Sequence, residues 1–485
     1  MLLPDLGVGI NYAPGLEPAL EACGELVSVV EIEPQTMWYP TRLASEPFRV
    51  DQAAVARVRE LPQAKIVHGV GLPCGGSLPP DPGHLRAFAQ SVHDLEAPWA
   101  SEHLSFNVAK GSQGVFETGF MLPPLQTARG VGTASASIRR LSSALDVPFA
   151  VETGVNYLRP RPGDLPDGEF IARVVERADC GILLDLHNVW ANARNGRQRL
   201  SHFLAEIPLD RVWEIHLAGG MEHEGYWLDA HSGAVPNELL EVTADLIPRL
   251  PNLHALIFEM FPPFLARFGP RAVASEVEKL LELWALRTKK NGPVRSRRRA
   301  KPVWQNADRA VASSTWESSL GTLAIGRPPG SPLEQELAQD PGLTVIQMLV
   351  NEFRAGTIVS MLRLTSRFLF MVLGESGFRR LLAEFAQEQP PHLFGSTEAD
   401  AFRAYLEQRQ VPIPHLLEVL AFERAADDVL LTGESRTVLF RCEPERLLTG
   451  LLEGEVRIVQ AEEDHTVHLR QVNGTIELSA RRTQT

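Results

Sequence analysis

Residues 180–190 read CGILLDLHNVW, and this stretch shows the pattern on which the fold depends. A short apolar run ends in Asp185, and an amphipathic segment follows it. Apolar runs of roughly four to eight residues are typical of strands that are buried on both faces, as in parallel sheets. The pattern recurs along the first half of the chain, with runs at Leu6–Ile10, Val27–Glu33, Lys65–Val70, Pro98–Leu104, Pro148–Thr153, Cys180–Leu186, Arg211–Leu217 and His254–Met260.

Helical periodicity fills the segments between these runs, for example at Gln52–Leu61 and Phe170–Ala178. Eight strands that alternate with helices over about 250 residues predict a (β/α)8 TIM barrel, which is an α/β fold. The competing arrangement is an open doubly wound sheet, which often carries a glycine-rich phosphate turn after its first strand. Gly7 and Gly9 lie inside the first predicted strand instead, so the barrel is favoured.

The chain of 485 residues and 53.5 kDa is too long for one ordinary domain. We predict a barrel domain over residues 1–285, a basic Pro- and Gly-rich linker over 286–332, and a smaller helical plus β-rich domain over 333–485. The linker contains the basic run Lys289–Lys301, for which a solvated role is favoured over contact with an acidic peptide or nucleic acid. In the last domain, helical periodicity covers 344–354, 358–373, 377–388, 398–409 and 415–426, and strand-like alternation covers 437–442, 456–460, 465–471 and 475–479.

Composition excludes several classes of protein. Lys and Arg number 47 against 60 Asp and Glu, and the net charge of −13 argues against a surface that grips nucleic acid. No apolar run approaches the roughly 18 residues of a membrane-spanning helix, and the N-terminus does not resemble a secretory signal. The four cysteines lie far apart and form no CxxC pair, which is typical of a reducing compartment. We expect a cytoplasmic protein with no nucleic-acid or membrane partner.

Metal-ligating side chains stand at the ends of six consecutive predicted strands. In a barrel these ends meet at one mouth, where active sites are built. Buried carboxylates and imidazoles at one mouth need a cation to neutralise them. These residues are His68, His103, Glu152, Asp185, His216 and Glu259, and the loop after the seventh strand adds Asp229 and His231.

So many ligands exceed the four to six that one divalent first-row metal takes. The sequence therefore predicts two or three ions, with Glu152 or Asp185 as a bridge. The ligands are nitrogen and oxygen only, which suits iron, manganese or zinc.

Several neighbouring residues allow two interpretations. Asn156 and Asn188 follow the ligand strands and either bind a metal or substrate or stabilise their loops. His187 lies two residues after Asp185 and either joins the site or is structural. Glu31 and Glu33 share one strand face near the mouth, where they either orient ligands and substrate or form a buried ion pair.

Six motifs at these positions resemble the multinuclear non-haem iron oxidases of the methanobactin-biosynthesis type, long known as domain of unknown function 692. The resemblance covers about residues 5–265 and includes a xylose-isomerase-like barrel. The motifs are VHGVGL (67–72), SEHL (101–104), VETGVNY (151–157), LLDLHNVWANARN (183–195), IHLAGG (215–220) and DAHSG (229–233).

The resemblance implies two or three Fe(II)/Fe(III) ions and O2-dependent modification of cysteine residues in a ribosomally made precursor peptide, with zinc or manganese as alternative metals. Catalysis would centre on Asp185, His216 and Glu152, and Glu33, Asn156 and His187 would contact substrate or support ligands. The implied ligands are His68, His103, Glu152, Asp185, Asn188, His216, Asp229, His231 and Glu259.

Two positions depart from the family pattern. His187 stands where the family commonly has the first of two asparagines, and Gly220 stands where a histidine often follows the first glycine. The departure at His187 concerns the number of metal ions, and the departure at Gly220 concerns contact with the substrate.

The C-terminal part, including FLFMVLGESGFRRLLAEFAQEQPP (368–391), resembles more loosely the separate partner protein that holds the precursor peptide. The chain is thus interpreted as a fusion of oxidase and partner, and tethering raises the effective concentration of the two modules.

Other functions have less support in the sequence. The main alternative is a zinc-dependent phosphodiesterase of the endonuclease IV type, which needs a basic face. Residues 1–280 contain 22 Lys and Arg against 34 Asp and Glu, a net charge of 22 − 34 = −12. A sugar isomerase is less favoured because this sequence has no obvious catalytic lysine near the ligand strands. A non-catalytic metal-storage or peptide-binding scaffold is the third alternative, and it predicts that function persists when Asp185 is replaced.

Overall fold

A computed structural model describes residues 3–43, 46–287, 311–455, 464–472 and 475–482. The chain divides into two compact units. The first unit comprises Met1–Trp38, Leu43–Ala324 and Pro328–Ile346, and the second comprises Tyr39–Arg42, Ile325–Arg327 and Gln347–Thr485.

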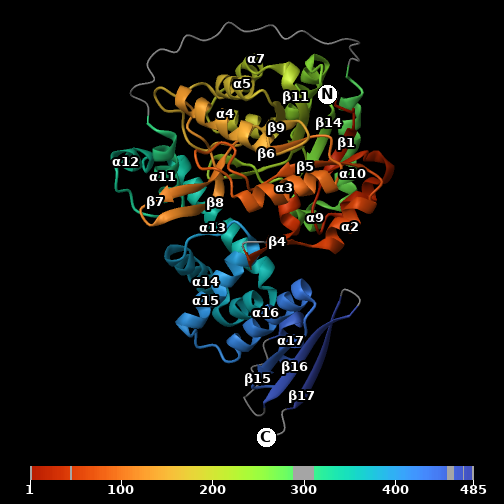
Figure 1. Ribbon diagram of the computed structural model, residues 1–485, viewed down its shortest axis with the longest axis vertical. Coiled ribbons are helices and arrows are strands. Elements are labelled where there is room, and N and C mark those ends of the chain that lie inside the picture. The colour runs from red at the N-terminus through yellow and green to blue at the C-terminus, as the bar shows by residue number, and fades with distance from the viewer. Residues whose placement is uncertain (1–2, 44–45, 288–310, 456–463, 473–474, 483–485) are drawn as a thin grey trace. The chain divides into compact units, whose positions relative to one another are not determined.

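A closed barrel of eight parallel strands forms the centre of the first unit (Figure 1). All eight predicted strands are present within a few residues of their expected positions, so the predicted TIM barrel is confirmed. Around the barrel the order is β1 (Gly7–Tyr12), β14 (Ala255–Glu259), β11 (Val212–Ala218), β10 (Gly181–Asp185), β9 (Phe149–Glu152), β6 (Ala100–His103), β5 (Ala64–Gly69) and β2 (Val29–Ile32). Their residues are almost all buried because both faces of each strand are covered.

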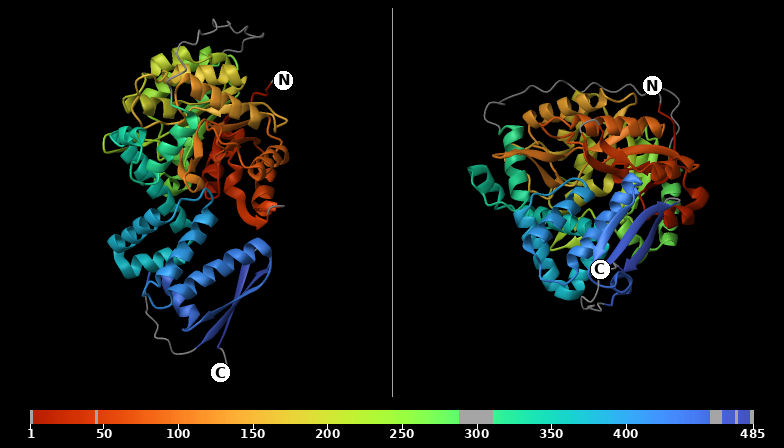
Figure 2. Two further views of the ribbon diagram at one scale, coloured as in Figure 1. Left: turned by 60° about the vertical axis from the view of Figure 1, so that its left-hand side comes forward. Right: turned by 60° about the horizontal axis from the view of Figure 1, so that its bottom comes forward.

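Helices cover the outside of the strands, as Figures 1 and 2 show. Each packs through one apolar stripe; α5, for example, buries Phe170, Ile171, Val174 and Val175. The helices are α1 (Glu17–Cys23), α2 (Gln52–Glu60), α3 (Pro82–Asp94), α4 (Ala128–Ser142), α5 (Asp167–Ala178), α6 (Leu186–Arg194), α7 (Leu200–Glu206), α8 (Asn237–Leu246), α9 (Pro262–Phe268) and α10 (Pro270–Trp284).

Three two-stranded sheets follow strands of the barrel. They are β3–β4 (Trp38–Leu43 and Glu46–Val50), β7–β8 (Phe106–Gly111 and Gly114–Leu122) and β12–β13 (Met221–His223 and Tyr226–Leu228), of which β7–β8 and β12–β13 are antiparallel hairpins. These sheets were not predicted from the sequence. The β7–β8 and β12–β13 hairpins lie in the loops after β6 and β11, so they border the mouth of the barrel.

The segment after the basic run packs against the barrel rather than forming a linker up to residue 332. Helix α11 (Ser313–Ala324) lies on the β7–β8 hairpin and buries Trp316 and Leu320. Glu317 accepts hydrogen bonds from the amide and hydroxyl of Ser77, at 2.8 and 2.5 Å. The Ser-, Thr- and Gly-rich composition of α11 is typical of a linker, which explains why its contacts were not predicted.

The rest of the predicted linker is only partly described. Helix α12 (Pro332–Leu337) begins where the linker was expected to end, and Ser331 and Glu334 form a capping box at its N-terminus. The basic run Lys289–Lys301 lies outside the described residues.

The second unit is helical and β-rich, as predicted. It contains most of α13 (Pro341–Met361), then α14 (Arg363–Glu388), α15 (Gly395–Arg409), α16 (Leu416–Thr432) and α17 (Pro444–Glu453), and the antiparallel sheet β15 (Arg436–Phe440), β16 (His465–Val472) and β17 (Thr475–Arg482). Its own hydrophobic core joins helices and sheet, with Phe385, Phe402, Val419, Phe440 and Leu469 at its centre. The strand predicted at 456–460 lies outside the described residues.

Among the described helices, no single one is both long and apolar enough to cross a membrane. Helices α13 and α14 meet that test only as a pair, by length and composition, and they are bent by 111° relative to each other.

The buried face of α11 yields a stability prediction. Leu320→Ala removes a fully buried side chain, so we expect the free energy of unfolding to fall by about 2–5 kcal/mol. Thr315→Ala on the exposed face of the same helix is the matched control, with an expected change below about 0.5 kcal/mol. Urea unfolding of the full chain measures both. Equal midpoints for the two variants would show that α11 does not pack on the barrel.

The Glu317–Ser77 contact yields a pH prediction. Burial raises the pKa of Glu317 to about 6 although the amide and hydroxyl of Ser77 favour the ionised carboxylate. A carboxyl group whose pKa is raised on folding stabilises the fold most when it is protonated. Relative to Glu317→Gln, the wild type should therefore lose stability as the pH rises from about 4.5 to about 6, and the difference should then level off. Parallel stability curves between pH 4.5 and 7.5 would contradict this.

Candidate metal centre

The predicted ligands lie together at the mouth of the barrel. His68, His103, Glu152, Asp185 and Glu259 stand at or next to the carboxyl ends of β5, β6, β9, β10 and β14, and His216 lies in β11. Asp229 and His231 come directly after β13. Because parallel strands of a barrel end at one rim, side chains at equivalent positions converge there. They form three adjoining clusters.

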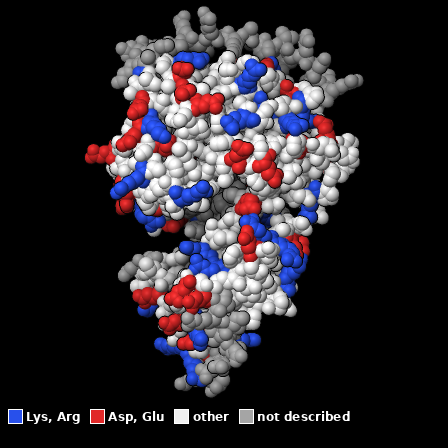
Figure 3. All heavy atoms as spheres, turned by 180° about the vertical axis from the view of Figure 1, so that it is seen from behind, with Lys and Arg blue, Asp and Glu red and all other residues white. Residues whose placement is uncertain are grey.

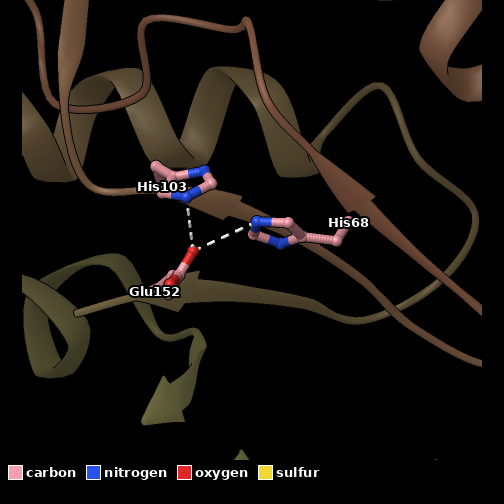
Figure 4. Close-up of side chains that lie close together, drawn as sticks. All are labelled: His68, His103 and Glu152. Atoms are coloured by element: carbon pink, nitrogen blue, oxygen red, sulfur yellow. Dashed lines mark ion pairs between the residues drawn. The ribbon is translucent and has the colours of Figure 1, made fainter. Parts of the chain in front are cut away.

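The first cluster joins His68 and His103 through one carboxylate (Figure 4). Oε2 of Glu152 lies 3.1 Å from Nε2 of His68 and 2.9 Å from Nε2 of His103. The three residues come from three neighbouring strands, β5, β6 and β9, and are buried or nearly so.

The second cluster surrounds His216. Its Nδ1 lies 3.1 Å from Oε2 of Glu259 and 4.0 Å from Oε1 of Glu152. Ligand atoms of Glu152, Asp185 and His216 all lie within 4.8 Å of one another. Glu152 therefore belongs to both the first and the second cluster, and a bridging role for Glu152 or Asp185 stays a prediction.

The third cluster contains Asp229, His231 and His187. Oδ1 of Asp229 lies 2.8 Å from Nε2 of His231 and 3.3 Å from Nδ1 of His187. Nε2 of His231 also lies 3.4 Å from Oε2 of Glu259, which links this cluster to the second. The three clusters are candidate metal-binding groups that adjoin one another.

The remaining predicted residues occupy different places around the clusters. Asn188 contacts Asp185 twice, through its amide N–H (2.7 Å) and its side-chain N–H (2.9 Å). The side-chain oxygen of Asn156 accepts from the amide of Leu158 at 3.0 Å, so that oxygen stabilises its own loop. Burial raises the pKa of Glu33, and the imidazole of His68 opposes the rise.

Supporting residues orient the ligand imidazoles. Nδ1 of His103 lies 3.1 Å from the carbonyl oxygen of Gly69, and Nδ1 of His68 lies 2.8 Å from Oγ of Ser101. Nε2 of His216 lies 3.1 Å from Oε2 of Glu31, so Glu31 orients a ligand. Such partners set which imidazole nitrogen is free to bind a metal.

Two supporting residues were missed. Oε1 of Glu214 lies 3.6 Å from Nε2 of His216, and Oε2 of Glu214 accepts from the indole of Trp99 at 2.9 Å. The strand periodicity of two contains the signal for one of them, since Glu214 precedes His216 by two residues and faces the same way. Trp99 has no comparable signal, because its contact spans more than a hundred residues.

The electrostatics of the clusters fit bound cations. Burial raises the pKa of Asp185 well above its ordinary value, and the nearby carboxylates of Asp229 and Glu152 raise it further. Burial also acts to raise the pKa of Glu152, but His103 and His68 hold it well below its usual range. The carboxylates thus depend on positive charge from their neighbours.

Unpaired polar atoms support the same conclusion. A buried polar atom without a hydrogen bond is costly and rare. Atoms that lack a well-aligned partner here are Oε1 of Glu31, Oε2 of Glu152, Nδ1 of His187, Oδ1 of Asn188, Nδ1 of His216, Oδ1 of Asp229, both ring nitrogens of His231 and Oε2 of Glu259. The donor set of imidazole nitrogens and carboxylate oxygens fits iron, manganese or zinc.

A mostly apolar pocket adjoins the clusters. His103, Asn188 and Asp229 form part of its wall, and Asn156 lines it as well. The apolar wall includes Phe120, Leu122, Pro123, Val155 and Ile171. A pocket of this kind, with a few polar groups on one side, is the usual form of a site that holds an organic substrate.

The two departures from the family pattern lie against each other. A Cβ atom placed on Gly220 would be 2.8 Å from Nε2 of His187 and 2.3 Å from Nε1 of Trp227. A side chain at position 220 would therefore occupy the space that these two rings fill.

Comparison with known proteins agrees with this geometry. The model of the RiPP precursor modification enzyme MbnB/TglH/ChrH family matches residues 8–262, where RiPP denotes a ribosomally synthesised and post-translationally modified peptide. A UPF0276 protein of Chromobacterium violaceum is 30% identical over 273 residues, covering 56% of this chain and 93% of the relative. A UPF0276 protein of Streptomyces avermitilis is 31% identical over 252 residues, covering 51% of this chain and 49% of that relative, so the chain matches about half of its length.

Among solved structures, D-allulose 3-epimerase from Methylomonas sp. in complex with D-allulose has a TM-score of 0.38 and 13% identity, over 59% of this chain and 99% of that chain. The family match, in contrast, runs from β1 to just beyond β14 and includes every strand of the barrel. This chain belongs to the MbnB/TglH/ChrH family of RiPP precursor modification enzymes.

Proposed function

We propose that this enzyme holds two or three iron ions at the barrel mouth and uses O2 to modify a cysteine residue of a ribosomally made precursor peptide. The observation that carries the proposal is the sharing of ligands between clusters. Glu152 faces both His103 and His216, and Glu259 faces both His216 and His231. Shared carboxylates are what a multinuclear centre requires, because adjacent cations repel each other unless an anion lies between them.

The residues divide into three groups of ligands. His68, His103 and Glu152 would hold one ion; Glu152, Asp185, His216 and Glu259 would hold the next; Asp229 and His231, with Asn188 nearby, would serve a third. Bound iron would supply electron exchange with O2 and would favour the thiolate form of a coordinated cysteine. Zinc or manganese in the same positions is the alternative metal content.

Cys74, which contacts the backbone of the first cluster, does not compete for this role. Sγ of Cys74 donates to the carbonyl oxygen of His103 at 2.9 Å, and burial raises the pKa of this thiol well above its ordinary value. The thiol therefore stays protonated and faces the backbone. A thiolate at the centre would have to come from the substrate.

The adjoining pocket is our candidate for the peptide site. Its apolar wall would exclude water from the reacting residue, and the side chains of Asn156 and Asn188, which line the pocket, are polar groups suited to peptide amides. We assign Glu33, Asn156 and His187 to the substrate or supporting role, and Asp185, His216 and Glu152 to the catalytic centre.

Charge favours a peptide over nucleic acid as the substrate. Figure 3 shows Lys and Arg side chains interspersed with Asp and Glu over the visible face of the first unit. A phosphodiesterase of the endonuclease IV type would need a continuous basic face for the phosphate backbone.

The central carboxylate provides a test of the whole proposal. Asp185→Ala should lower the rate of peptide modification by more than about 100-fold, beyond the range for supporting groups, while peptide affinity is kept. The measurement is aerobic incubation of iron-loaded enzyme with the precursor peptide encoded beside the gene, followed by mass spectrometry. Glu241→Ala, on the exposed face of α8, is the control. An unchanged peptide mass with iron-loaded wild type would refute the proposed reaction.

We also propose that the second unit recruits the precursor peptide. The support is its independent hydrophobic core and its looser resemblance to the family's partner protein. A tethered recruiting unit raises the local concentration of peptide at the barrel without adding any contact to the reacting residue.

A truncated chain tests this role. A chain that ends after Ile346 keeps the first unit, so we expect unchanged metal content but a KM for peptide raised by about 10²–10⁴-fold. Steady-state kinetics by mass spectrometry measures the change, and metal analysis controls for folding. An unaltered KM would exclude the second unit from peptide recruitment.

A further inference from the structure

His187 has an environment that differs from that of every other imidazole discussed above. Its ring is fully buried at the start of α6. Nδ1 faces Oδ1 of Asp229 at 3.3 Å, while Nε2 accepts a hydrogen bond from the indole N–H of Trp227 at 2.9 Å. One nitrogen therefore faces a candidate metal ligand, and the other faces a donor.

The indole of Trp227 is held rigidly. The backbone N–H of Trp227 donates to the side-chain oxygen of Asn195 at 2.7 Å, and the carbonyl of Trp227 accepts from the Asn195 amide at 2.9 Å. Its ring meets Trp190 edge-on, with centroids 5.1 Å apart, and the guanidinium of Arg194 lies over both rings. Gly220 has no side chain, and the indole of Trp227 and the ring of His187 occupy the space that a Cβ atom at this position would fill. The donor is thus fixed against Nε2.

This contact decides where the imidazole carries its proton. An indole N–H can only donate, so Nε2 of His187 must be an acceptor and cannot hold a proton. A neutral imidazole has one N–H, which is then at Nδ1. That N–H lies 3.3 Å from Oδ1 of Asp229 without the alignment of a hydrogen bond in this structure, so the contact between the two groups is electrostatic.

Other histidines of the centre show the opposite arrangement. A metal-binding imidazole donates its second N–H to an acceptor, which leaves the first nitrogen free for the metal. Nδ1 of His103 has the carbonyl oxygen of Gly69 as this acceptor, and Nε2 of His216 has the carboxylate of Glu31. His187 has a donor in the corresponding place. Its Nδ1 consequently lacks the lone pair that a ligand needs.

We propose that His187 is a positioning residue that orients the carboxylate of Asp229, with Trp227 fixing its tautomer, and that it is not a metal ligand. The inference rests on the proposed metal centre. A second contact orients the same residue, since the backbone N–H of Asp229 donates to the hydroxyl of Tyr157 at 3.2 Å. The third cluster then offers Asp229 and His231 as its ligands, with His187 behind Asp229.

Two substitutions at position 187 separate positioning from ligation. His187→Asn places an amide N–H where Nδ1–H stands, because both nitrogens are bonded to Cγ, and it replaces the imidazole by an amide oxygen, which is a weaker donor for iron. His187→Leu keeps the volume and removes the donor. The full chain is stripped of metal and titrated anaerobically with Fe(II) against a competing chelator, and bound iron is counted by elemental analysis. Thermal unfolding confirms that each variant folds.

If His187 is a positioning residue, the His187→Asn variant should bind as many iron equivalents as the wild type, with an affinity within about threefold of the wild-type value. The same role predicts that His187→Leu weakens the loosest site by about 10–100-fold, the range for groups that support a ligand. Trp227→Phe keeps the ring packing and removes the donor, so it should also weaken that site, by a smaller factor.

Each other outcome overturns the proposal in a recognisable way. If His187→Asn loses a full equivalent of iron, as His187→Leu does, His187 is a ligand. If His187→Leu binds like the wild type, His187 does not orient Asp229. If Trp227→Phe binds like the wild type while His187→Leu does not, Trp227 does not fix the tautomer. A wild-type chain that binds no iron would instead refute the metal centre itself.

Discussion

The concentration of buried charge at the barrel mouth is the constraint on which the rest of the structure depends. Carboxylates of Glu152, Asp185, Asp229 and Glu259 stand within one small volume with three or more imidazoles. Removal from water makes such an assembly costly unless opposite charges are shared. Burial and neighbouring carboxylates raise the pKa of Asp185, and the imidazoles lower the pKa of Glu152. The sharing of Glu152 and Glu259 between clusters follows from this need.

The barrel supplies the rigidity that the centre requires. Ligands near the ends of hydrogen-bonded strands cannot move independently, and a multinuclear site tolerates little displacement. A ring of supporting groups adds to this, from the carbonyl of Gly69 to the Trp99–Glu214 pair beneath His216. These groups also decide which nitrogen of each imidazole is available, and this is how His187 differs from His103 and His216.

Helix α11 contacts a loop that lies next to the candidate metal centre. It follows the basic segment in sequence, yet Glu317 binds the loop that leaves β5 just after His68. In the same loop the amides of Gly71 and Leu72 donate to Glu102, the residue before His103. The chain that leads to the second unit is thus packed against the loop beside the first cluster. These contacts couple the stability of α11 to the geometry of the loop at the mouth of the barrel.

Local pattern in the sequence was sufficient for the barrel and for most of the centre. Eight apolar runs predict the strands because burial on both faces leaves no polar positions. The polar residues at the ends of six of these runs predict candidate ligands because parallel strands end together. Glu214 was missed although it lies two residues before His216 on the same strand face. Trp99, Trp227 and the packing of α11 were not predicted, since none of these has a periodic signal. Their partners are distant in sequence, as with Trp227 and His187, forty residues apart. Only the closed barrel brings such residues into contact, and only that contact decides which nitrogen of His187 carries the proton.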